Sequence, residues 1–217
     1  MSKIQHQNIA TFYGMSFDIT NWHAVFESGQ KGTLMEVLSS NCNEVFFDFE
    51  MRMAFVLNLI EGLHYIHHSP LRYHGNLSPE MCLINERYTL RISGVGISYV
   101  KDAFANTKDR PSSTQVQNKD VESLGQLMES ICNDIQDTPQ SYRNIASDCR
   151  MIPCPSVQQV RNKITRAFPR QGNIVELLLK RLEKHADDLE DTVKTRTNEL
   201  VEEMGKVDLL LREMLPV

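Results

Sequence analysis

The sequence predicts an α+β fold that is mostly α-helical and ends in a long helix of the coiled-coil type. Three observations predict it: alternating aromatic and small residues near the N-terminus, strongly apolar helical segments in the middle, and a heptad repeat in the last part of the chain. Hydrophobic residues make up 41% of the 217 residues, which is enough to build a core. We therefore expect a domain over residues 1–170 and a separate helix over residues 171–217.

The N-terminal part of the chain predicts a β-hairpin. Residues 8–18 (NIATFYGMSFD) are rich in aromatic and small side chains, and Trp22, Ala24 and Phe26 alternate with polar residues after a turn. The two glycines of GQKGTL then interrupt this pattern, so a short helix over residues 34–39 should follow the hairpin.

The longest helix of the domain is predicted over residues 49–68, and Pro70 ends it. Its apolar residues cover so much of the helix surface that the helix should lie inside the domain. Two short strands should follow, within residues 81–86 and 89–96. The helical spacing is set by Met53, Val56, Ile60, Leu63 and His67.

The second half of the domain should contain two further helices. Residues 101–119 are polar and lack periodicity, which is typical of a surface loop. Residues 121–131 carry apolar side chains on one face and predict a second buried helix, and residues 157–168 predict a third. The three prolines within residues 133–158 predict an irregular connection between them.

The C-terminal segment, residues 173–215, contains one glycine and no proline. Its apolar residues recur in alternating steps of three and four, with one irregular step at Leu189, Val193, Thr197 and Leu200. The pattern favours a two-stranded parallel coiled coil over a single amphipathic helix lying on the domain, because such a helix would be roughly 60 Å long. The expected dimer seam comprises Leu178, Leu182, Leu189, Leu200, Met204, Val207, Leu211 and Met214.

The composition argues against several classes of function. A net charge of −5 is unfavourable for a nucleic-acid partner. No apolar run is long enough to cross a bilayer, and the N-terminus has no signal-peptide pattern. The five scattered cysteines favour free thiols in a reducing, cytoplasmic compartment. Neither Cys149 with Cys154 nor His64 with His68 has the further ligands of a metal site, so we expect no metal.

The stretch HGNLSPEM, residues 74–81, has the shape of a protein-kinase catalytic loop, H-R-D-L-x-P-E-N. The groups that transfer a phosphate are missing. Asn76 stands in place of the catalytic Asp, and an amide cannot act as a general base. Met81 and Gly94 stand where magnesium would be held by an Asn and by the Asp of D-F-G. We therefore expect no catalytic residue here, and a structural role for His74, whose ring should tie the loop to the backbone near Gly94.

Asp120 opens the segment DVESLG at the predicted start of the second buried helix. We expect it to be an N-cap or a first-turn acid of that helix. We also expect its side chain to anchor the loop at Asn76.

These segments together resemble the receptor guanylyl cyclase family. HGNLSPEMCLINERYTLRISGVGI is similar to the family's kinase-homology domain, in which H-G-N-L replaces H-R-D-L. ESGQKGTLMEVL resembles its hinge, and NKDVESLGQLMESI resembles one of its later helices. LEDTVKTRTNEL and the closing LLLREMLP resemble the helical linker that leads into the cyclase domain. The resemblance covers nearly the whole chain and implies a protein-kinase-like fold with a truncated N-terminal lobe.

The resemblance implies a non-catalytic pseudokinase region that acts in cGMP signalling by dimerisation and conformational transmission. The implied partner is a second copy or a related guanylyl cyclase, bound through the C-terminal helix. The family converts GTP to cGMP and is a plasma-membrane receptor with this region on the cytosolic side. Because neither a kinase catalytic set nor a cyclase domain is present, we expect no enzymatic activity from the chain as given.

Four alternatives stay open at this point. The hinge residues Glu27, Ser28 and Gly29 could contact the adenine of ATP, so a weak nucleotide-binding regulatory module is one of them. No phosphate cradle remains, so we expect no firmly bound cofactor. The chain could also be a fragment of a longer active guanylate cyclase, a kinase that works by an unusual route, or an incomplete product whose strands expose an open edge.

Overall fold

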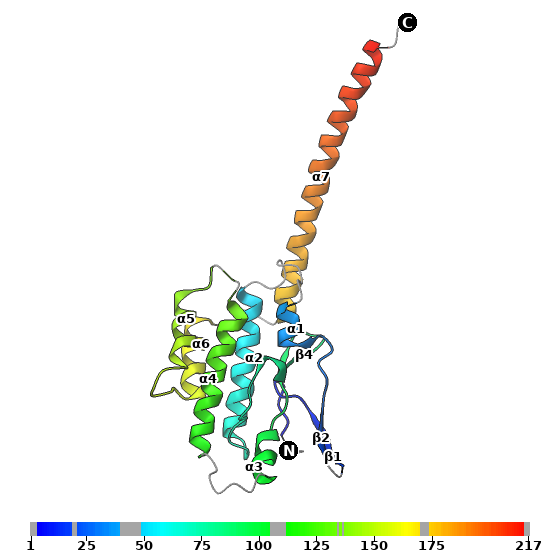
Figure 1. The fold of residues 1–217 in the computed structure, drawn as a ribbon. Coiled ribbons are helices and arrows are strands. Elements are labelled where there is room, and N and C mark those ends of the chain that lie inside the picture. Colours follow the sequence, from blue (N-terminus) through cyan, green and yellow to red (C-terminus); the bar gives the residue numbers. More distant parts are fainter. Residues whose placement is uncertain are drawn as a thin grey trace. The chain divides into compact units, whose positions relative to one another are not determined.

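The computed structural model of the protein describes residues 4–18, 21–39, 49–104, 112–133, 135, 137–169 and 174–214. The chain divides into two compact units, residues 1–174 and 175–217, and each is described by itself. The first unit combines helices with two small sheets, so the predicted mostly helical α+β class is confirmed (Figure 1).

The predicted N-terminal hairpin is present. Strands β1 (Phe12–Phe17) and β2 (Trp22–Phe26) pair in antiparallel orientation, and the register shifts by one residue between Phe12 and Gly14. The rings of Phe12 and Phe26 contact each other across the pair, with centroids 5.3 Å apart. Alternation of aromatic and small residues therefore predicted both the strands and their pairing.

A second sheet includes the strand that begins directly after the predicted catalytic loop, whose last residue is Met81. It has the order β3-β4-β5, with both pairs antiparallel, and the short helix α1 follows β3 directly. The alternating apolar residues of β4 and β5 point into the core, because Cys82, Ile84, Leu90 and Ile92 are fully buried. The bounds are Gly32–Thr33 for β3, Leu34–Ser39 for α1, Cys82–Ile84 for β4 and Leu90–Ile92 for β5.

The core of the first unit is built around helix α2. This helix contacts α4, α6 and β5, and α5 packs against α4 and α6. Figure 1 shows α2 between α4 and the strands, so it is covered on both sides, which explains why its apolar residues extend around so much of its surface. The helices are α2 (Phe49–His68), the single 3₁₀ turn η1 (Pro79–Met81), α3 (Ile97–Phe104), α4 (Ser113–Cys132), α5 (Gln140–Asp148) and α6 (Val157–Ala167).

Two predictions about the middle of the chain were wrong. The loop predicted over residues 101–119 contains the end of α3 and the beginning of α4. Helix α4 begins early because Ser112 forms a capping box with Gln115, which supplies hydrogen-bond partners at its first turn. The segment predicted to be irregular contains α5, a short helix that begins after Pro139.

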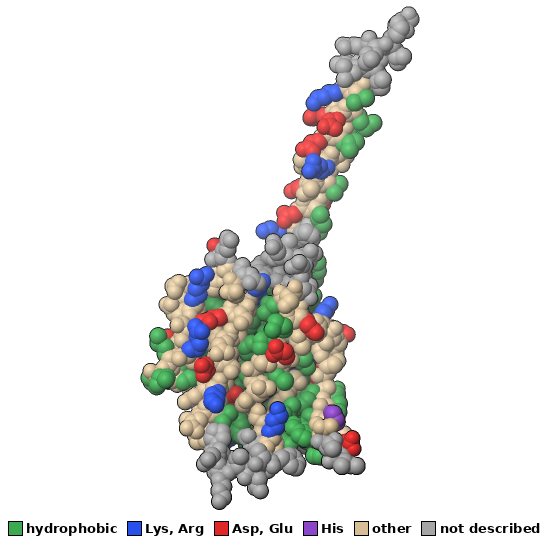
Figure 2. All heavy atoms as spheres, in the orientation of Figure 1, with side chains coloured by type: hydrophobic (Ala, Val, Ile, Leu, Met, Phe, Trp, Pro, Cys, Tyr) green, Lys and Arg blue, Asp and Glu red, His purple; other side chains and the backbone are tan. Residues whose placement is uncertain are grey.

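The second unit consists of helix α7 (Ile174–Met214), which confirms the long predicted helix. Along its described part, hydrophobic side chains gather on one side and charged side chains on the other (Figure 2). Leu182, Leu189 and Leu200 are between 51% and 60% exposed. None of the described helices combines the length and the apolar character needed to span a bilayer.

Candidate functional site

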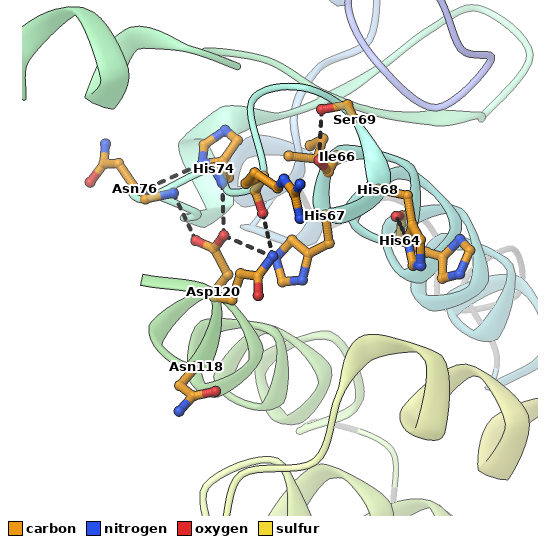
Figure 3. Close-up of polar contacts among 12 residues, drawn as sticks. His64, Ile66, His67, His68, Ser69, His74, Asn76, Asn118 and Asp120 are labelled. Carbon is orange, nitrogen blue, oxygen red and sulfur yellow. Dashed lines mark hydrogen bonds and ion pairs between the residues drawn. The ribbon is translucent and has the colours of Figure 1, made fainter. Parts of the chain in front are cut away.

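The candidate site is the loop that follows α2, and Asp120 of α4 lies at its centre. One carboxylate oxygen of Asp120 accepts a hydrogen bond from the backbone N–H of His74 at 2.7 Å, and the other accepts one from Gly75 at 2.8 Å. The same carboxylate lies 3.1 Å from Nε2 of His67 at the end of α2. Figure 3 shows the Asp120 side chain pointing into the loop from α4. Asp120 therefore connects the loop to two helices.

Asp120 anchors the loop, but its place in the helix and the loop residues it binds differ from the prediction. It is not an N-cap or a first-turn acid, because α4 begins at Ser113 and Asp120 lies in its interior, 1% exposed. Its carboxylate binds the backbone of His74 and Gly75, whereas the backbone N–H of Asn76 donates to Nδ1 of the His74 ring at 3.3 Å. A buried carboxylate needs such partners, since an unpaired charge in the interior is costly.

The ring of His74 connects the loop to the backbone next to Gly94, as its predicted structural role requires. Its Nε2 lies 2.8 Å from the carbonyl oxygen of Ser93, next to Gly94, and its Nδ1 accepts from Asn76. These two contacts require a neutral ring that donates from Nε2. Burial lowers the pKa of His74, although the Ser93 carbonyl and the Asp120 carboxylate act in the opposite direction. The ring is therefore held as a neutral structural bridge between the loop and β5.

Gly75, in the position of the kinase Arg, has a conformation and a neighbour that both exclude a side chain. Its φ is +79°, in the region that favours glycine. A Cβ atom at this position would lie 2.9 Å from both Cβ and Oγ of Ser98, in the first turn of α3. The rings of Tyr73 and Tyr99 also stack between the loop and α3, with centroids 5.8 Å apart. Helix α3 therefore packs directly onto the loop.

The two positions expected to lack metal ligands lie side by side. Gly94 has a φ of +74°, and a Cβ atom there would lie 3.0 Å from Sδ of Met81. The thioether of Met81 thus occupies space next to the position where the D-F-G carboxylate would begin. A thioether is a poor ligand for magnesium, and a glycine supplies no side-chain ligand. Asn76 is exposed and supplies only a neutral amide.

The hinge segment uses its polar groups within the protein. The backbone N–H of Glu27 donates to the carbonyl of Thr11 at 2.8 Å. Its carboxylate accepts hydrogen bonds from the backbone N–H and the hydroxyl of Thr11 at 3.2 and 3.0 Å. Nη1 of Arg91 in β5 donates to both carboxylate oxygens, at 2.5 and 2.6 Å. Burial raises the pKa of Glu27, but the hydrogen bonds from Thr11 and the Arg91 charge outweigh it and lower the pKa. At Gly29, a Cβ atom would lie 2.7 Å from the carbonyl oxygen of Gly32, so the chain is tightly folded here.

Histidines and cysteines outside the loop are placed as ordinary structural residues. The rings of His64 and His68 contact each other in a tilted arrangement with centroids 4.2 Å apart, and Nδ1 of His68 lies within hydrogen-bond distance of the carbonyl oxygen of His64. Among the residues that the structure describes, no group of three or more ligand-type side chains could hold a metal ion. Burial raises the pKa values of Cys82 and Cys149 to about 12, which makes both thiols poor nucleophiles.

The predicted dimer seam lies along α7. Each of its members whose side chain is described is more than half exposed: Leu182, Leu189, Leu200, Met204 and Val207. The side chains of Leu178, Leu211 and Met214 lie outside the described residues. Apolar residues thus repeat along an exposed face of α7.

Some members of the site were not predicted. The backbone carbonyl of Ser93 binds the His74 ring, and the side chain of Ser98 lies close to Gly75. Neither role has a signal in the sequence. His67 had been assigned to the apolar stripe of α2, yet its ring reaches Asp120. The sequence does contain one signal for this polar cluster: His67 stands at the end of a buried helix, and a second histidine, His74, follows in the loop.

Comparison with known proteins gives two results. Residues 1–135 match the family described as protein tyrosine and serine/threonine kinase. The whole chain is 26% identical to a quarter (25%) of guanylate cyclase 2G of Mus musculus. It is also 26% identical to 26% of receptor-type guanylate cyclase gcy-13, and 27% identical to 24% of gcy-14, both of Caenorhabditis elegans. The chain therefore spans about a quarter of the length of the curated relatives it matches.

Proposed function

Because the chain belongs to the protein tyrosine and serine/threonine kinase family, we propose that it is a kinase-homology regulatory region of the receptor guanylate cyclase type. In this proposal it acts in cGMP signalling without transferring a phosphate. The relatives that match it over its whole length are named as guanylate cyclases, which supports the cyclic-nucleotide context. A relative's cyclase activity belongs to that protein, and for this chain it is a proposal only.

The observation that carries the non-catalytic part of the proposal is the contact between Met81 and Gly94. Phosphoryl transfer requires magnesium ions that neutralise the phosphates and a carboxylate that receives the substrate proton. Here the two metal-ligand positions hold a thioether and a glycine that face each other, and the base position holds Asn76. The loop keeps its shape through Asp120 and His74, so its contribution is to hold α2, α4 and β5 together.

The proposed mechanism is transmission through a pair of α7 helices. The exposed apolar seam supports it, because a helix of 41 residues with such a stripe is stabilised when a second helix covers it. The partner would be a second copy of this chain or the matching helix of a related guanylyl cyclase. In this arrangement a shift or rotation of one α7 helix moves the α7 helix that is packed against it.

A dimerisation experiment tests this proposal. The full chain should be a dimer at tens of micromolar in light scattering, and replacing Leu182 and Leu211 together with Asp should raise the dissociation constant at least tenfold. The expected loss follows from placing four charges in the apolar seam of one dimer. Asn198→Asp, on the opposite side of the helix, is the matched control. A monomeric wild-type chain, or a double variant that dimerises normally, would exclude the seam.

A further inference from the structure

We propose that the α7 seam selects its partner by charge, and that the favoured partner is a helix with basic residues where this chain has Glu203 and Asp208. A second copy of the chain is then the weaker of the two partners. The inference deepens the proposed function and rests on it, because it takes two α7 helices to pair in parallel through the seam.

The regular part of the seam determines which residues flank it. From residue 193 to residue 214 the seam positions recur in steps of 4-3-4-3-4-3, which is an unbroken heptad pattern within α7. In that pattern Arg196 and Glu203 directly precede a positions, whereas Val201 and Asp208 directly follow d positions. A parallel pair of helices brings a residue of the first kind close to the residue five places later in the other helix.

A pair of identical helices brings like charges together at these flanking positions. Glu203 of one copy lies opposite Asp208 of the other, and the two-fold symmetry of the pair repeats this contact on the other side of the seam. Arg196 lies opposite Val201, which carries no charge. Over residues 196–208 the homodimer therefore has two repulsive flanking contacts and no attractive one, and like charges at neighbouring positions are destabilising.

The positive charge of Arg196 is already used within its own helix, whereas the negative charge of Glu203 is not. Nη1 of Arg196 lies 3.2 Å from a carboxylate oxygen of Glu199. Glu203 is exposed, and in the part of α7 that the structure describes its carboxylate forms no ion pair, although Lys206 is three residues away. The carboxylate of Glu203 is therefore available to a group on a second helix.

A helix with lysine or arginine at the positions matching 203 and 208 would turn both repulsive contacts into ion pairs. The apolar seam would stay the same, so such a partner loses nothing that a second copy offers. Flanking charges of this kind set partner choice in coiled coils, because they penalise one pair and favour another. The chemistry that the seam recognises is thus an apolar heptad face with basic residues beside it.

The test uses a charge-reversed full chain, carrying Glu203→Lys and Asp208→Lys, as the basic partner. It is mixed with the wild-type full chain, and fluorescence energy transfer between labelled copies measures the dissociation constants of the mixed pair and of the wild-type homodimer. At about 50 mM salt, where exposed charges are weakly screened, the mixed pair should dissociate with a constant roughly 3- to 10-fold below that of the homodimer.

Salt should act on the two pairs in opposite directions. Raising the salt concentration to about 0.5 M screens repulsion in the homodimer and attraction in the mixed pair. The wild-type homodimer should therefore tighten, and the mixed pair should weaken.

The matched control is the full chain with Glu190→Lys and Glu202→Lys. Both residues are exposed and lie at heptad positions that point away from the seam, and the change in net charge is the same. Mixed with the wild type, this control should form a pair about as tight as the wild-type homodimer.

A mixed pair no tighter than the control pair, or a wild-type homodimer that weakens as salt is added, would overturn the selection by charge and leave pairing through the seam intact. Chains that stay monomeric alone and in every mixture would instead contradict the proposed pairing itself.

Discussion

The carboxylate of Asp120 accepts two backbone hydrogen bonds and contacts a histidine ring while almost completely buried. The backbone N–H groups of His74 and Gly75 have this carboxylate as their acceptor in the structure. If it were removed, both groups would lose their partner, and the buried N–H of His74 would have little access to water, whereas Gly75 is exposed. Groups left unpaired in this way cost more than the hydrogen bond itself contributes to stability.

Replacing Asp120 with Ala should therefore lower the free energy of unfolding by about 1–3 kcal/mol, because it leaves the buried N–H of His74 without an acceptor. Asp120→Asn should cost less, since the amide keeps one oxygen acceptor. Urea unfolding followed by circular dichroism measures both. Asn118→Ala, on the exposed side of α4, is the matched control and should stay within about 0.5 kcal/mol of wild type. An Asp120→Ala variant as stable as the control would show that the loop does not depend on this carboxylate.

At the scale of elements, the hinge and β5 are held together by the pair Glu27 and Arg91. The pair is partly buried, with side chains 20% and 29% exposed. Arg91 binds the carboxylate of Glu27, and the carbonyl oxygen of Thr11 accepts a hydrogen bond from the backbone N–H of Glu27. We propose that the hinge therefore offers little to an adenine ring and that the chain binds ATP no better than millimolar.

This proposal predicts no thermal shift with ATP and magnesium at tens of micromolar, since binding at that strength occupies only a few per cent of the sites. Glu27→Ala should lower the melting temperature by removing the pair with Arg91, and it should still gain no ATP-dependent shift because no phosphate cradle is created. Differential scanning fluorimetry measures both effects. A clear, saturable shift of the wild-type chain would instead establish a nucleotide-binding module.

The predicted elements succeeded where periodicity was strong and failed where it was weak. The hairpin and α2 follow from alternation and from an apolar stripe. Helix α5 was missed because it has only nine residues and follows a proline. The start of α4 was missed because its first turn is polar and is fixed by the cap at Ser112. The same error placed Asp120 at a helix terminus, although it lies inside the helix.

Contacts between distant segments were predicted only where a motif indicated them. The catalytic-loop pattern indicated that His74 ties the loop to the segment near Gly94, and the ring bonds Ser93. The approach of Ser98 to Gly75 depends on how α3 leaves β5, and one sequence carries no signal for that geometry. The sequence thus predicted which catalytic groups the site lacks, but it did not predict how the side chains around the site pack.

At the scale of the whole molecule, burial of neutral histidine makes stability depend on pH. Burial lowers the pKa of His74, and it also lowers those of the more solvated His64 and His6. A histidine whose pKa is lower in the folded state than the ordinary value of about 6.5 binds fewer protons folded than unfolded. Its contribution to stability is complete above about pH 6.5 and is lost as the pH falls toward its folded pKa.

The free energy of unfolding should therefore fall by about 1 kcal/mol between pH 7.5 and pH 5.5, mostly through His74. Glu27 does not contribute in this window, because its pKa is lowered from a value already below it. Urea unfolding at several pH values measures the slope, and His23→Asn, on the exposed face of the hairpin, should leave it unchanged. A free energy that is flat or rises toward pH 5.5 would contradict this assignment of the buried histidine.

The contact between Met81 and Gly94 has a consequence for the evolutionary history of the loop. An aspartate restored at position 94 would meet the thioether of Met81 and would adopt a backbone angle that disfavours side chains. An arginine restored at position 75 would meet Ser98 in the same way. Each single reversion therefore requires the Met81 or Ser98 side chain to move, and a strained backbone angle to be tolerated, before any metal site or active loop exists. Restoring the function would thus need changes in the surrounding packing as well as in the residues that carry the chemistry.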